Sequence, residues 1–308
     1  MKTYLVTGAA GFIGSAIARR LIGEGHRVWT IDNLSTGRRE NLPEGIQFVH
    51  GACQDPDSIL ALQATAFDAV LHFAGQSSGE VSFDDPSYDL RTNTESSLRL
   101  IDFALSYGCR RFIYASSMSV YGRVADTRIA ESHPCKPLSF YGVGKMASEH
   151  YLRIYREKGL QDTALRLFNV YGPHQNMGNL RQGMVSIYLA QMLQGDKVIV
   201  KGAMDRFRDF IFIDDVVDCA CSIIEDPRAY GGVFNVGTGI RTTVGSLLEK
   251  LQAVSRLTTP IVQLEGTPGD QAGIFADVSH AQQTLGFTSK VKLDDGLKAM
   301  VDWALGVS

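Results

Sequence analysis

The fold is decided near the N-terminus, by the stretch Tyr4-Leu-Val-Thr-Gly8-Ala-Ala-Gly11-Phe-Ile-Gly14. Its first residues predict a short buried strand, and Ser15 to Glu24 has helical spacing. A strand, a glycine-rich turn and a helix together make a pyrophosphate site, because glycines let the backbone approach the phosphates and the helix N-terminus offers free N–H groups. The alternative is a glycine-rich turn without a ligand. In this strand–turn–helix context the G-x-x-G-x-x-G spacing favours a dinucleotide.

An acidic residue ends the second predicted strand, Val28–Ile31. Asp32 stands about twenty residues past the glycines, where a carboxylate accepts both hydroxyls of an adenine ribose and repels a 2′-phosphate. Arg38 and Arg39 follow in a polar loop and would favour NADP if they faced the ribose. As exposed loop charges they are expected to be solvated, so the sequence favours NAD over NADP.

Strands and helices then alternate up to about residue 170, which predicts an α/β protein with a Rossmann-type, doubly wound parallel sheet. Such a sheet binds its ligand at the C-terminal ends of its strands. The residues expected at that edge are Gly8, Asp32, Ala74, Ser117 and Asn169. The predicted strands are Ile46–His50, Ala69–Phe73, Arg111–Ala115 and Thr163–Phe168, and the predicted helices are Pro56–Leu62, Tyr88–Tyr107 and Tyr141–Arg156.

Beyond residue 170 this alternation breaks down. We therefore expect an NAD-binding domain over 1–170, which also receives a strand and helix from about 209–237, and a smaller substrate-binding domain over 171–308. The strand Phe210–Ile213 is followed by a helix that Asp214 or Asp215 would cap. The remaining expected elements are a loop over Pro173–Gly183, a last sheet strand over Val233–Val236, and helices over Met184–Leu193, Val244–Val254 and Leu293–Leu305.

The pair Tyr141 and Lys145 lies four residues apart, so the two side chains are expected on one side of a helix. An ammonium beside a phenol favours the phenolate and lowers the phenol's pKa, which would make Tyr141 an acid/base group near neutral pH. The Ser117 hydroxyl could then share a substrate hydroxyl with that tyrosine. A bare Tyr-x-x-x-Lys match also occurs on ordinary amphipathic helices, and the glycine-rich N-terminus is what favours catalysis here.

The composition is that of an ordinary globular protein, with 308 residues, 44% hydrophobic and 20% charged. The formal net charge of -3 gives no sign of a nucleic-acid or anionic-membrane partner. No apolar run approaches the ~18 residues that a membrane span needs. The cysteines are scattered and odd in number, which favours free thiols in a reducing cytoplasm over disulfides or a metal site.

These residues give the chain a resemblance to the extended short-chain dehydrogenase/reductase family. It most resembles the NAD-dependent nucleotide-sugar epimerase/dehydratase branch, and UDP-glucose 4-epimerases within it. The match covers nearly the whole chain and is far more specific for the family than for the substrate. Its motifs are His72-Phe-Ala-Gly75, Ser116-Ser-Met-Ser-Val-Tyr-Gly122, Arg166-Leu-Phe-Asn-Val-Tyr-Gly-Pro173, Arg208-Asp-Phe210, Asn235-Val-Gly-Thr-Gly239 and Pro268-Gly-Asp270.

The resemblance implies a role for each matching residue. Ser117 would polarise the sugar O4, Tyr141 would be the base, and Lys145 would hold the nicotinamide ribose. Asn169 and Arg208 would bind the nucleotide diphosphate; the alternatives are that Asn169 only ends a strand and that Arg208 is a surface cation. The implied substrate-binding set is Ser77, Ser117, Asn169, Arg208 and Asp270, and the implied NAD-binding set is Gly8, Gly11, Phe12, Ile13, Gly14, Asp32, Asn33, Ser35, Thr36, Gly37, Phe73, Ala74, Gly75, Asn93, Tyr141 and Lys145.

Departures from the family pattern narrow the implied chemistry. Dehydrating relatives carry an Asp-Glu pair directly after the catalytic hydroxyl residue. Decarboxylating relatives carry a glutamate there, and GDP-fucose-forming relatives carry a cysteine in the same loop. In this chain Met118 and Ser119 follow Ser117 instead. What remains is 4-epimerisation, on a UDP-hexose, UDP-N-acetylhexosamine or UDP-hexuronate. The enzymatic alternative is a net oxidoreductase that exchanges NAD(H) and acts on a nucleotide-linked keto sugar. A non-catalytic dinucleotide-binding protein would not need Ser117, Tyr141 and Lys145 together.

Other departures concern how the ligands are held. Ala52 replaces an aspartate that contacts adenine in many relatives, and Thr267 replaces a second arginine that clamps the diphosphate. The helices over Tyr88–Tyr107 and Tyr141–Arg156 resemble those that pair into a four-helix dimer interface. We therefore expect a homodimer.

Overall fold

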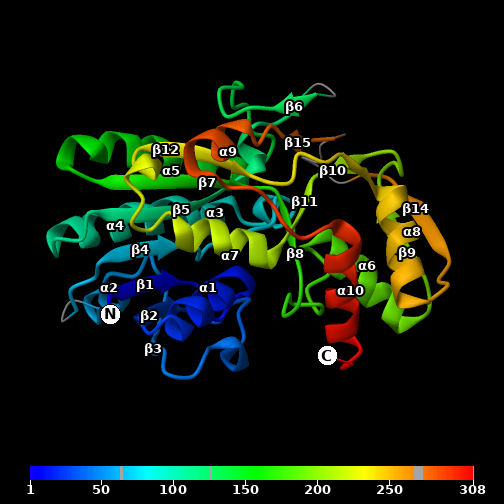
Figure 1. The fold of residues 1–308 in the computed structure, drawn as a ribbon, viewed down its shortest axis with the longest axis horizontal. Helices are drawn as coiled ribbons and strands as arrows, with labels where there is room; N and C mark the ends of the chain where they lie inside the picture. The colour runs from blue at the N-terminus through cyan, green and yellow to red at the C-terminus, as the bar shows by residue number, and fades with distance from the viewer. Residues whose placement is uncertain (63–64, 125–126, 267–272, 308) are drawn as a thin grey trace.

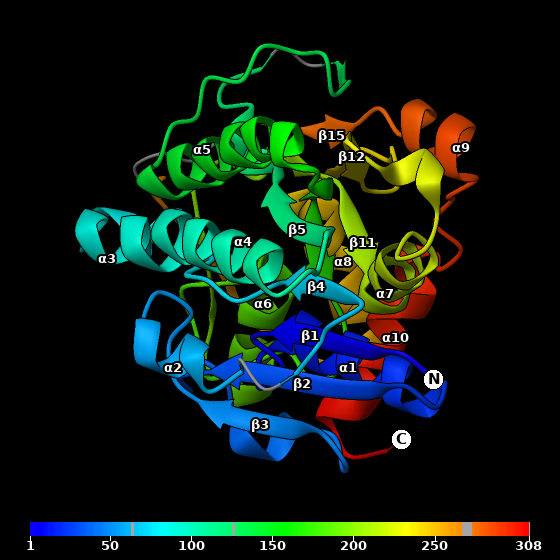
Figure 2. The same ribbon diagram turned by 90° about the vertical axis from the view of Figure 1, so that its left-hand side faces the viewer.

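The computed structural model describes residues 1–62, 65–124, 127–266 and 273–307. Within these residues, one seven-stranded sheet runs in the order β12-β7-β5-β4-β1-β2-β3 (Figures 1 and 2). All of its strand pairs are parallel, and the strand order reverses between β1 and β4, so the predicted Rossmann-type fold is confirmed. The strands are β1 (Thr3–Thr7), β2 (Arg27–Asp32), β3 (Gln47–His50), β4 (Ala69–His72), β5 (Arg111–Ser117), β7 (Gln161–Leu167) and β12 (Gly232–Val236).

Helices cover both faces of this sheet. Because neighbouring side chains on a strand point to opposite faces, Tyr4 and Val6 of β1 pack on one side and Leu5 on the other. Figure 2 shows the helices of one face, α4 and α5, opposite those of the other face, α1 and α7. Their bounds are α1 (Phe12–Gly23), α4 (Ser96–Ser106), α5 (Phe140–Tyr155) and α7 (Ile213–Ser222); the short α2 (Pro56–Leu60) follows β3.

The helix predicted over Tyr88–Tyr107 is interrupted. It consists of α3 (Pro86–Leu90), a π-helical turn over Arg91–Glu95, and then α4. Such turns are often found at functional sites. Here the turn carries Asn93, one of the expected cofactor residues, fully buried toward the sheet edge.

Short strands and four further helices build the described C-terminal part of the molecule. The predicted strand over Phe210–Ile213 is shorter than expected, and it pairs with the strand after β7 rather than joining the large sheet. Strands of two or three residues carry too little pattern to be recognised in a sequence. The pairs are β8 (Asn169–Tyr171) with β11 (Phe210–Phe212), β9 (Val198–Lys201) with β14 (Ile261–Leu264), β10 (Phe207–Arg208) with β13 (Thr242–Thr243), and β6 (Arg128–Ile129) with β15 (Phe275–Ala276); the helices are α6 (Met184–Gln194), α8 (Val244–Ser255) and α10 (Leu293–Ala304), with a shorter α9 (Ser279–Leu285).

The predicted cap of α7 is wrong. The helix begins at Ile213, so Asp214 and Asp215 lie inside its first turn. Asp215 is buried and accepts hydrogen bonds from the backbone N–H groups of Lys290 (2.9 Å) and Val291 (3.1 Å). Its carboxylate therefore ties the segment before α10 to α7, instead of capping the helix on which it lies.

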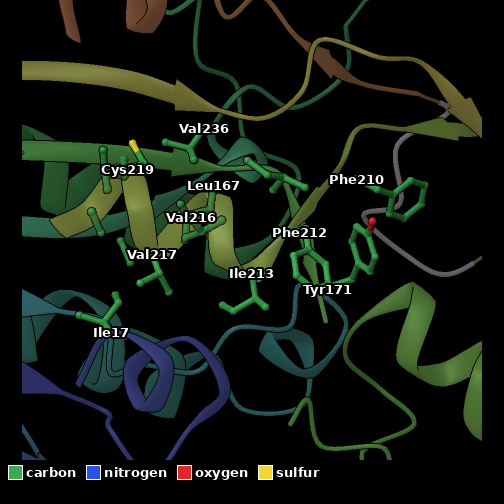
Figure 3. Close-up of a cluster of buried hydrophobic side chains, with 14 of the residues drawn as sticks. Ile17, Leu167, Tyr171, Phe210, Phe212, Ile213, Val216, Val217, Cys219 and Val236 are labelled. Atoms are coloured by element: carbon green, nitrogen blue, oxygen red, sulfur yellow. The ribbon is translucent and has the colours of Figure 1, made fainter. Parts of the chain in front are cut away.

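The largest hydrophobic cluster joins the sheet to the C-terminal part. Figure 3 shows Val217 of α7 between Ile17 of α1 on one side and Leu167 of the sheet on the other, with Phe212 of β11 toward the right of the view. These side chains are buried, so the edge of the sheet and the short strands beside it share one core. In the described part of the chain, no helix has the length and apolarity that crossing a bilayer requires.

Candidate active site

A cavity of about 430 Å³ lies where β1, β2 and β4 end. Its size is in the range of small-molecule sites. The loops that follow these strands supply most of its wall. The expected residues that line it are Gly8, Gly11, Phe12, Ile13, Gly14, Asp32, Asn33, Ser35, Thr36, Gly37, Phe73, Ala74, Gly75 and Ser77, together with Ala52. Lining residues that no sequence pattern indicated include Gln76, Ser78, Gln175, Asn176, Asn179 and Gln182.

The floor of the cavity is backbone. A Cβ on Gly14 would lie 2.3 Å from the carbonyl oxygen of Gly8, so no side chain fits at that position. The close contact lets α1 begin at Phe12, three residues earlier than predicted, directly against the turn. The first-turn amides of a helix have no partner within the helix, and here they face the cavity that the turn encloses. These residues fit a pyrophosphate.

Asp32 lines the end of the cavity where the adenine ribose of NAD is expected to bind. Its Oδ2 accepts a hydrogen bond from the Ala10 N–H (3.0 Å) and its Oδ1 accepts one from the Leu34 N–H (2.8 Å). Burial raises the pKa of Asp32, and both backbone bonds oppose that rise. The guanidinium of Arg38 is engaged elsewhere, with Asn176 Oδ1 at 3.1 Å and Glu40 at 3.9 Å. A carboxylate at this position fits NAD better than a cofactor with a 2′-phosphate.

Ser117 and Tyr141 come together where α5 packs on β5, and neither is among the residues that line the cavity. Ser117 is the last residue of β5, and Tyr141 lies in the first turn of α5. The Ser139 hydroxyl caps this helix by accepting a hydrogen bond from the Gly142 N–H (3.1 Å), which fixes where the first turn starts. Both residues are buried, and the Ser117 hydroxyl lies near enough to the phenol to oppose the rise that burial causes in its pKa. The pair could therefore hold one substrate hydroxyl between them.

The predicted effect of Lys145 on Tyr141 is wrong for the chain alone. Burial raises the pKa of Tyr141 to about 12, and the Ser117 hydroxyl opposes the rise. The Lys145 ammonium instead donates to the carbonyl oxygen of Ala115 (2.8 Å) and lies 5.7 Å from the centre of the Tyr141 ring. Burial also lowers the pKa of Lys145 itself, to about 8. Loss of hydration therefore dominates the pKa shifts of both Tyr141 and Lys145.

Asn93 supports the cavity wall from behind. Its Nδ2 donates to the carbonyl oxygen of Gln76 (2.9 Å), and a Cβ on Gly75 would lie 2.5 Å from its Oδ1. That Oδ1 is buried and has no hydrogen-bond partner among the described residues. An amide oxygen in this state is suited to a donor that arrives with a ligand.

The expected diphosphate residues lie close together on neighbouring short strands. Asn169 opens β8, and its Nδ2 donates to the Asp209 carbonyl oxygen (3.0 Å). Arg208, the residue before Asp209, is only 5% exposed, so it is not a surface cation. Burial is the main cause that lowers its pKa, to about 10. Asp270 and Thr267 lie outside the described residues.

The loop between β8 and α6 crosses the cavity and contacts one of its rims through Asn176. The Nδ2 of Asn176 donates to the Thr36 carbonyl oxygen (3.4 Å), and its Oδ1 accepts from Arg38. Thr36 belongs to the loop after β2, which surrounds the ribose end. One end of the crossing loop is therefore tied to the cofactor side.

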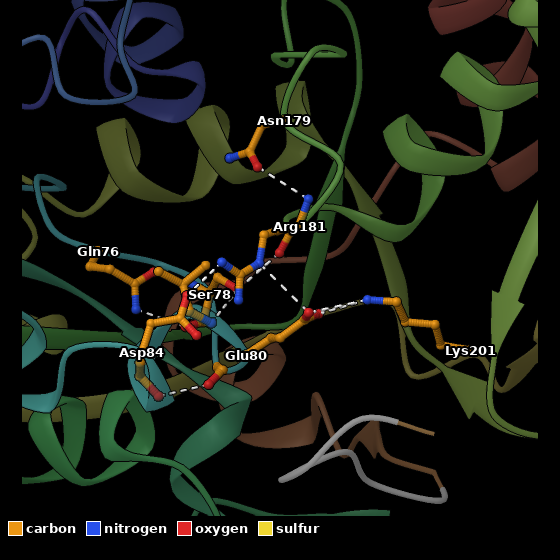
Figure 4. Close-up of polar contacts among 10 residues, drawn as sticks. Gln76, Ser78, Glu80, Asp84, Asn179, Arg181 and Lys201 are labelled. Atoms are coloured by element: carbon orange, nitrogen blue, oxygen red, sulfur yellow. Dashed lines mark hydrogen bonds and ion pairs between the residues drawn. The ribbon is translucent and has the colours of Figure 1, made fainter. Parts of the chain in front are cut away.

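The other end of this loop is tied to the opposite rim (Figure 4). The Gln182 side chain donates to the Ser77 hydroxyl, and the Ser78 hydroxyl donates to the Arg181 carbonyl oxygen (2.9 Å). The Arg181 guanidinium pairs with Asp84 and lies 3.6 Å from Glu80. We call residues 175–182 the strap, because they bridge both rims and line the cavity between them.

Comparison with known proteins agrees with this geometry. Residues 4–237 match the NAD dependent epimerase/dehydratase family. A UDP-glucose 4-epimerase of Mycolicibacterium smegmatis is 35% identical to this chain, and the match covers 98% of both. The crystal structure of a Thermotoga maritima UDP-glucose 4-epimerase with UDP-glucose has a TM-score of 0.95 at 34% identity, covering 99% of each chain.

A relative named for another sugar is nearly as similar. It is a UDP-N-acetylglucosamine 4-epimerase from Methanobrevibacter ruminantium M1, in complex with UDP-N-acetylmuramic acid. Its TM-score is 0.92 at 30% identity, covering 100% of this chain and 99% of that chain. The chain described here therefore belongs to the NAD dependent epimerase/dehydratase family, as its motifs predicted, and NAD is its cofactor.

Proposed function

We propose that this protein inverts C4 of a UDP-linked sugar. The observation that carries the proposal is that the buried Ser117 hydroxyl acts on the Tyr141 phenol, in a chain whose cavity fits NAD. The turn after Ser117 holds Met118 and Ser119, and the Ser119 N–H donates to the Ser117 Oγ (3.2 Å). Neither side chain can act as the carboxylate that dehydration or decarboxylation requires, so the site supports oxidation and reduction at one carbon.

The protein's own side chains transfer one proton, that of the sugar O4 hydroxyl. Tyr141 takes the proton of the sugar O4 hydroxyl and later returns it, while Ser117 holds the same oxygen by a hydrogen bond. Bound NAD supplies the hydride acceptor and donor, together with a positive ring that favours the phenolate. The 4-keto sugar turns over in the pocket between the two hydride transfers. Arg208 and Asn169 are the proposed diphosphate contacts, since a guanidinium pairs bidentately with phosphate.

The strap favours an epimerase over a net oxidoreductase. An epimerase ends each turnover with NAD in its starting form, whereas an oxidoreductase has to exchange it. A loop tied to both rims of the cofactor cavity slows that exchange. Proton NMR of the protein with UDP-glucose, UDP-N-acetylglucosamine and UDP-glucuronic acid tests the proposal directly. Inversion at C4 without accumulating NADH is expected; NADH with an oxidised sugar would establish the oxidoreductase.

The protein is also proposed to form a homodimer through a patch on α3, α5 and the segments that precede them. We define the patch as Phe83, Leu90, Leu138, Phe140, Val143 and Ile154, all of them exposed apolar side chains. Val143 and Ile154, both in the helix predicted over Tyr141–Arg156, are 49% and 53% exposed in the single chain. Exposed apolar patches of this kind mark interaction surfaces, and a second copy buries them by packing helix against helix.

Light scattering at micromolar concentration is expected to give the mass of two chains. Ile154→Glu, which places a charge in the patch, is expected to shift the protein toward monomer. Val307→Glu, at another exposed apolar residue outside the patch, serves as the control. A monomer without any substitution would contradict the dimer.

A cytoplasmic location is proposed as well, supported by the five cysteines, which are all free thiols.

A further inference from the structure

A buried carboxylate outside the Ser117–Tyr141 pair lies between the cofactor cavity and α5. Asp89, in α3, is 1% exposed. Its Oδ1 accepts hydrogen bonds from Gln76 Nε2 (2.8 Å) and Asn93 Nδ2 (3.2 Å). Its Oδ2 is buried with no hydrogen-bond partner among the described residues. A buried carboxylate is costly unless nearby charge or hydrogen bonds compensate it, so this position calls for an explanation.

The unpartnered oxygen faces the part of α5 that carries the reactive side chains. A Cβ on Gly144 would lie 3.5 Å from Asp89 Oδ2, and Gly144 is the residue directly before Lys145. The carboxylate therefore packs against the turn between Tyr141 and Lys145. In the protein interior little water screens such a charge, so the carboxylate acts on the side chains of this turn.

Asp89 and Lys145 each favour the charged form of the other. Burial raises the pKa of Asp89, and the Lys145 ammonium opposes that rise. Burial lowers the pKa of Lys145, and the Asp89 carboxylate opposes that fall. Glu149 acts on Lys145 in the same direction, but its charge is already neutralised by Arg166 at 2.7 Å. The hydrogen-bond partners of Asp89 are two neutral amides, so its charge is left to act on α5.

The other groups around Lys145 supply no negative charge near neutral pH. From β4, His72 is buried, and its pKa is lowered to about 3, so it is neutral. From β5, the Tyr114 ring lies 4.8 Å from the ammonium, and burial raises the pKa of that phenol. From α5 itself, Tyr141 has its pKa raised to about 12 and is a neutral phenol in the chain alone.

We propose that Asp89 is a positioning residue, whose buried carboxylate keeps the Lys145 ammonium charged while it fixes Gln76 and Asn93 at the edge of the cofactor cavity. Its catalytic consequence rests on the proposed epimerase reaction. Asp89 does not reach a reacting atom. It acts through Lys145, which would hold the nicotinamide ribose, and through the field at Tyr141.

The direct test is the titration of Lys145 in protein labelled with carbon-13 at the lysine Cε, with Lys145→Met to assign the signal. Asp89→Asn removes the charge at constant shape, so the pKa of Lys145 is expected to fall by about one unit. Asp89→Ser removes the same charge with a smaller side chain and is expected to give the same shift. Glu95→Gln removes a partly exposed charge, which pairs with Arg99, from the neighbouring π-helical turn and is expected to leave the signal unchanged.

The pH dependence of turnover provides the second readout. Loss of a negative charge lowers the pKa of a phenol as well as that of an ammonium, so both limbs of the kcat profile are expected to move to lower pH in Asp89→Asn. Lower turnover at every pH with an unchanged Lys145 titration would show a purely structural role and overturn the proposal. If the protein epimerises none of the UDP-sugars, the proposed function fails, while the Lys145 titration still decides the role of Asp89.

Discussion

The two sides of the active site are built in different ways. On the cofactor side, Gly8 and Gly14 bring backbone against backbone, and Asp32 holds the turn by accepting main-chain hydrogen bonds. On the reaction side, side chains from β5 and α5 meet across a long stretch of sequence. Backbone contacts have no freedom to adjust, whereas buried side chains can be changed singly. Binding of NAD and chemistry on the sugar should therefore be separable by substitution.

The largest effect is expected on the reaction side, from Tyr141→Phe. The ring is retained, so packing and NAD content should be preserved, while the group that takes the O4 proton is lost. We expect kcat to fall by about 10²–10⁴-fold, the usual contribution of a general acid/base group. Turnover and bound NAD are measured on the same preparation. Near-normal turnover would show that Tyr141 is not the base, and loss of NAD would show that the two sides are not separable.

Gly14→Ala tests the cofactor side. Its methyl group would lie 2.3 Å from the Gly8 carbonyl oxygen, so the turn or the start of α1 has to move. We expect NAD affinity to fall by about 100-fold or more, because the pyrophosphate site is made of that backbone. Gly23→Ala is the matched control in the same helix, where an added Cβ meets nothing within 4 Å. Equal NAD affinity in both variants would contradict a backbone-built cradle.

The cofactor side was the more predictable from sequence for the same physical reason. A glycine-rich turn between a strand and a helix is a local pattern, and Asp32 stands at the end of the next strand. The strap residues Gln175 and Asn176 carry no such pattern, because polar side chains in a loop become a cavity wall only through the tertiary fold. The pKa of Tyr141 is dominated by burial, which the four-residue spacing of Tyr141 and Lys145 does not reveal.

The strap is where the two sides meet, so it offers the smallest and sharpest test. Asn176→Ala with Arg181→Ala removes one side-chain anchor at each rim. These contacts are partly exposed, and such contacts are individually weak, so NAD release is expected to speed up by only about fivefold to tenfold, with little change in kcat.

Lys201→Ala is the matched control for the strap. It removes another cation that pairs with Glu80, at 3.1 Å, without touching the strap itself. Release is followed as the loss of bound NAD on dilution into an NAD-scavenging mixture. If release stays slow in the double variant, retention belongs to the backbone cradle alone. If release speeds up, NAD is held by backbone on one side and by the side chains of the strap on the other. Loosening the strap would then convert the protein into an epimerase that exchanges its cofactor.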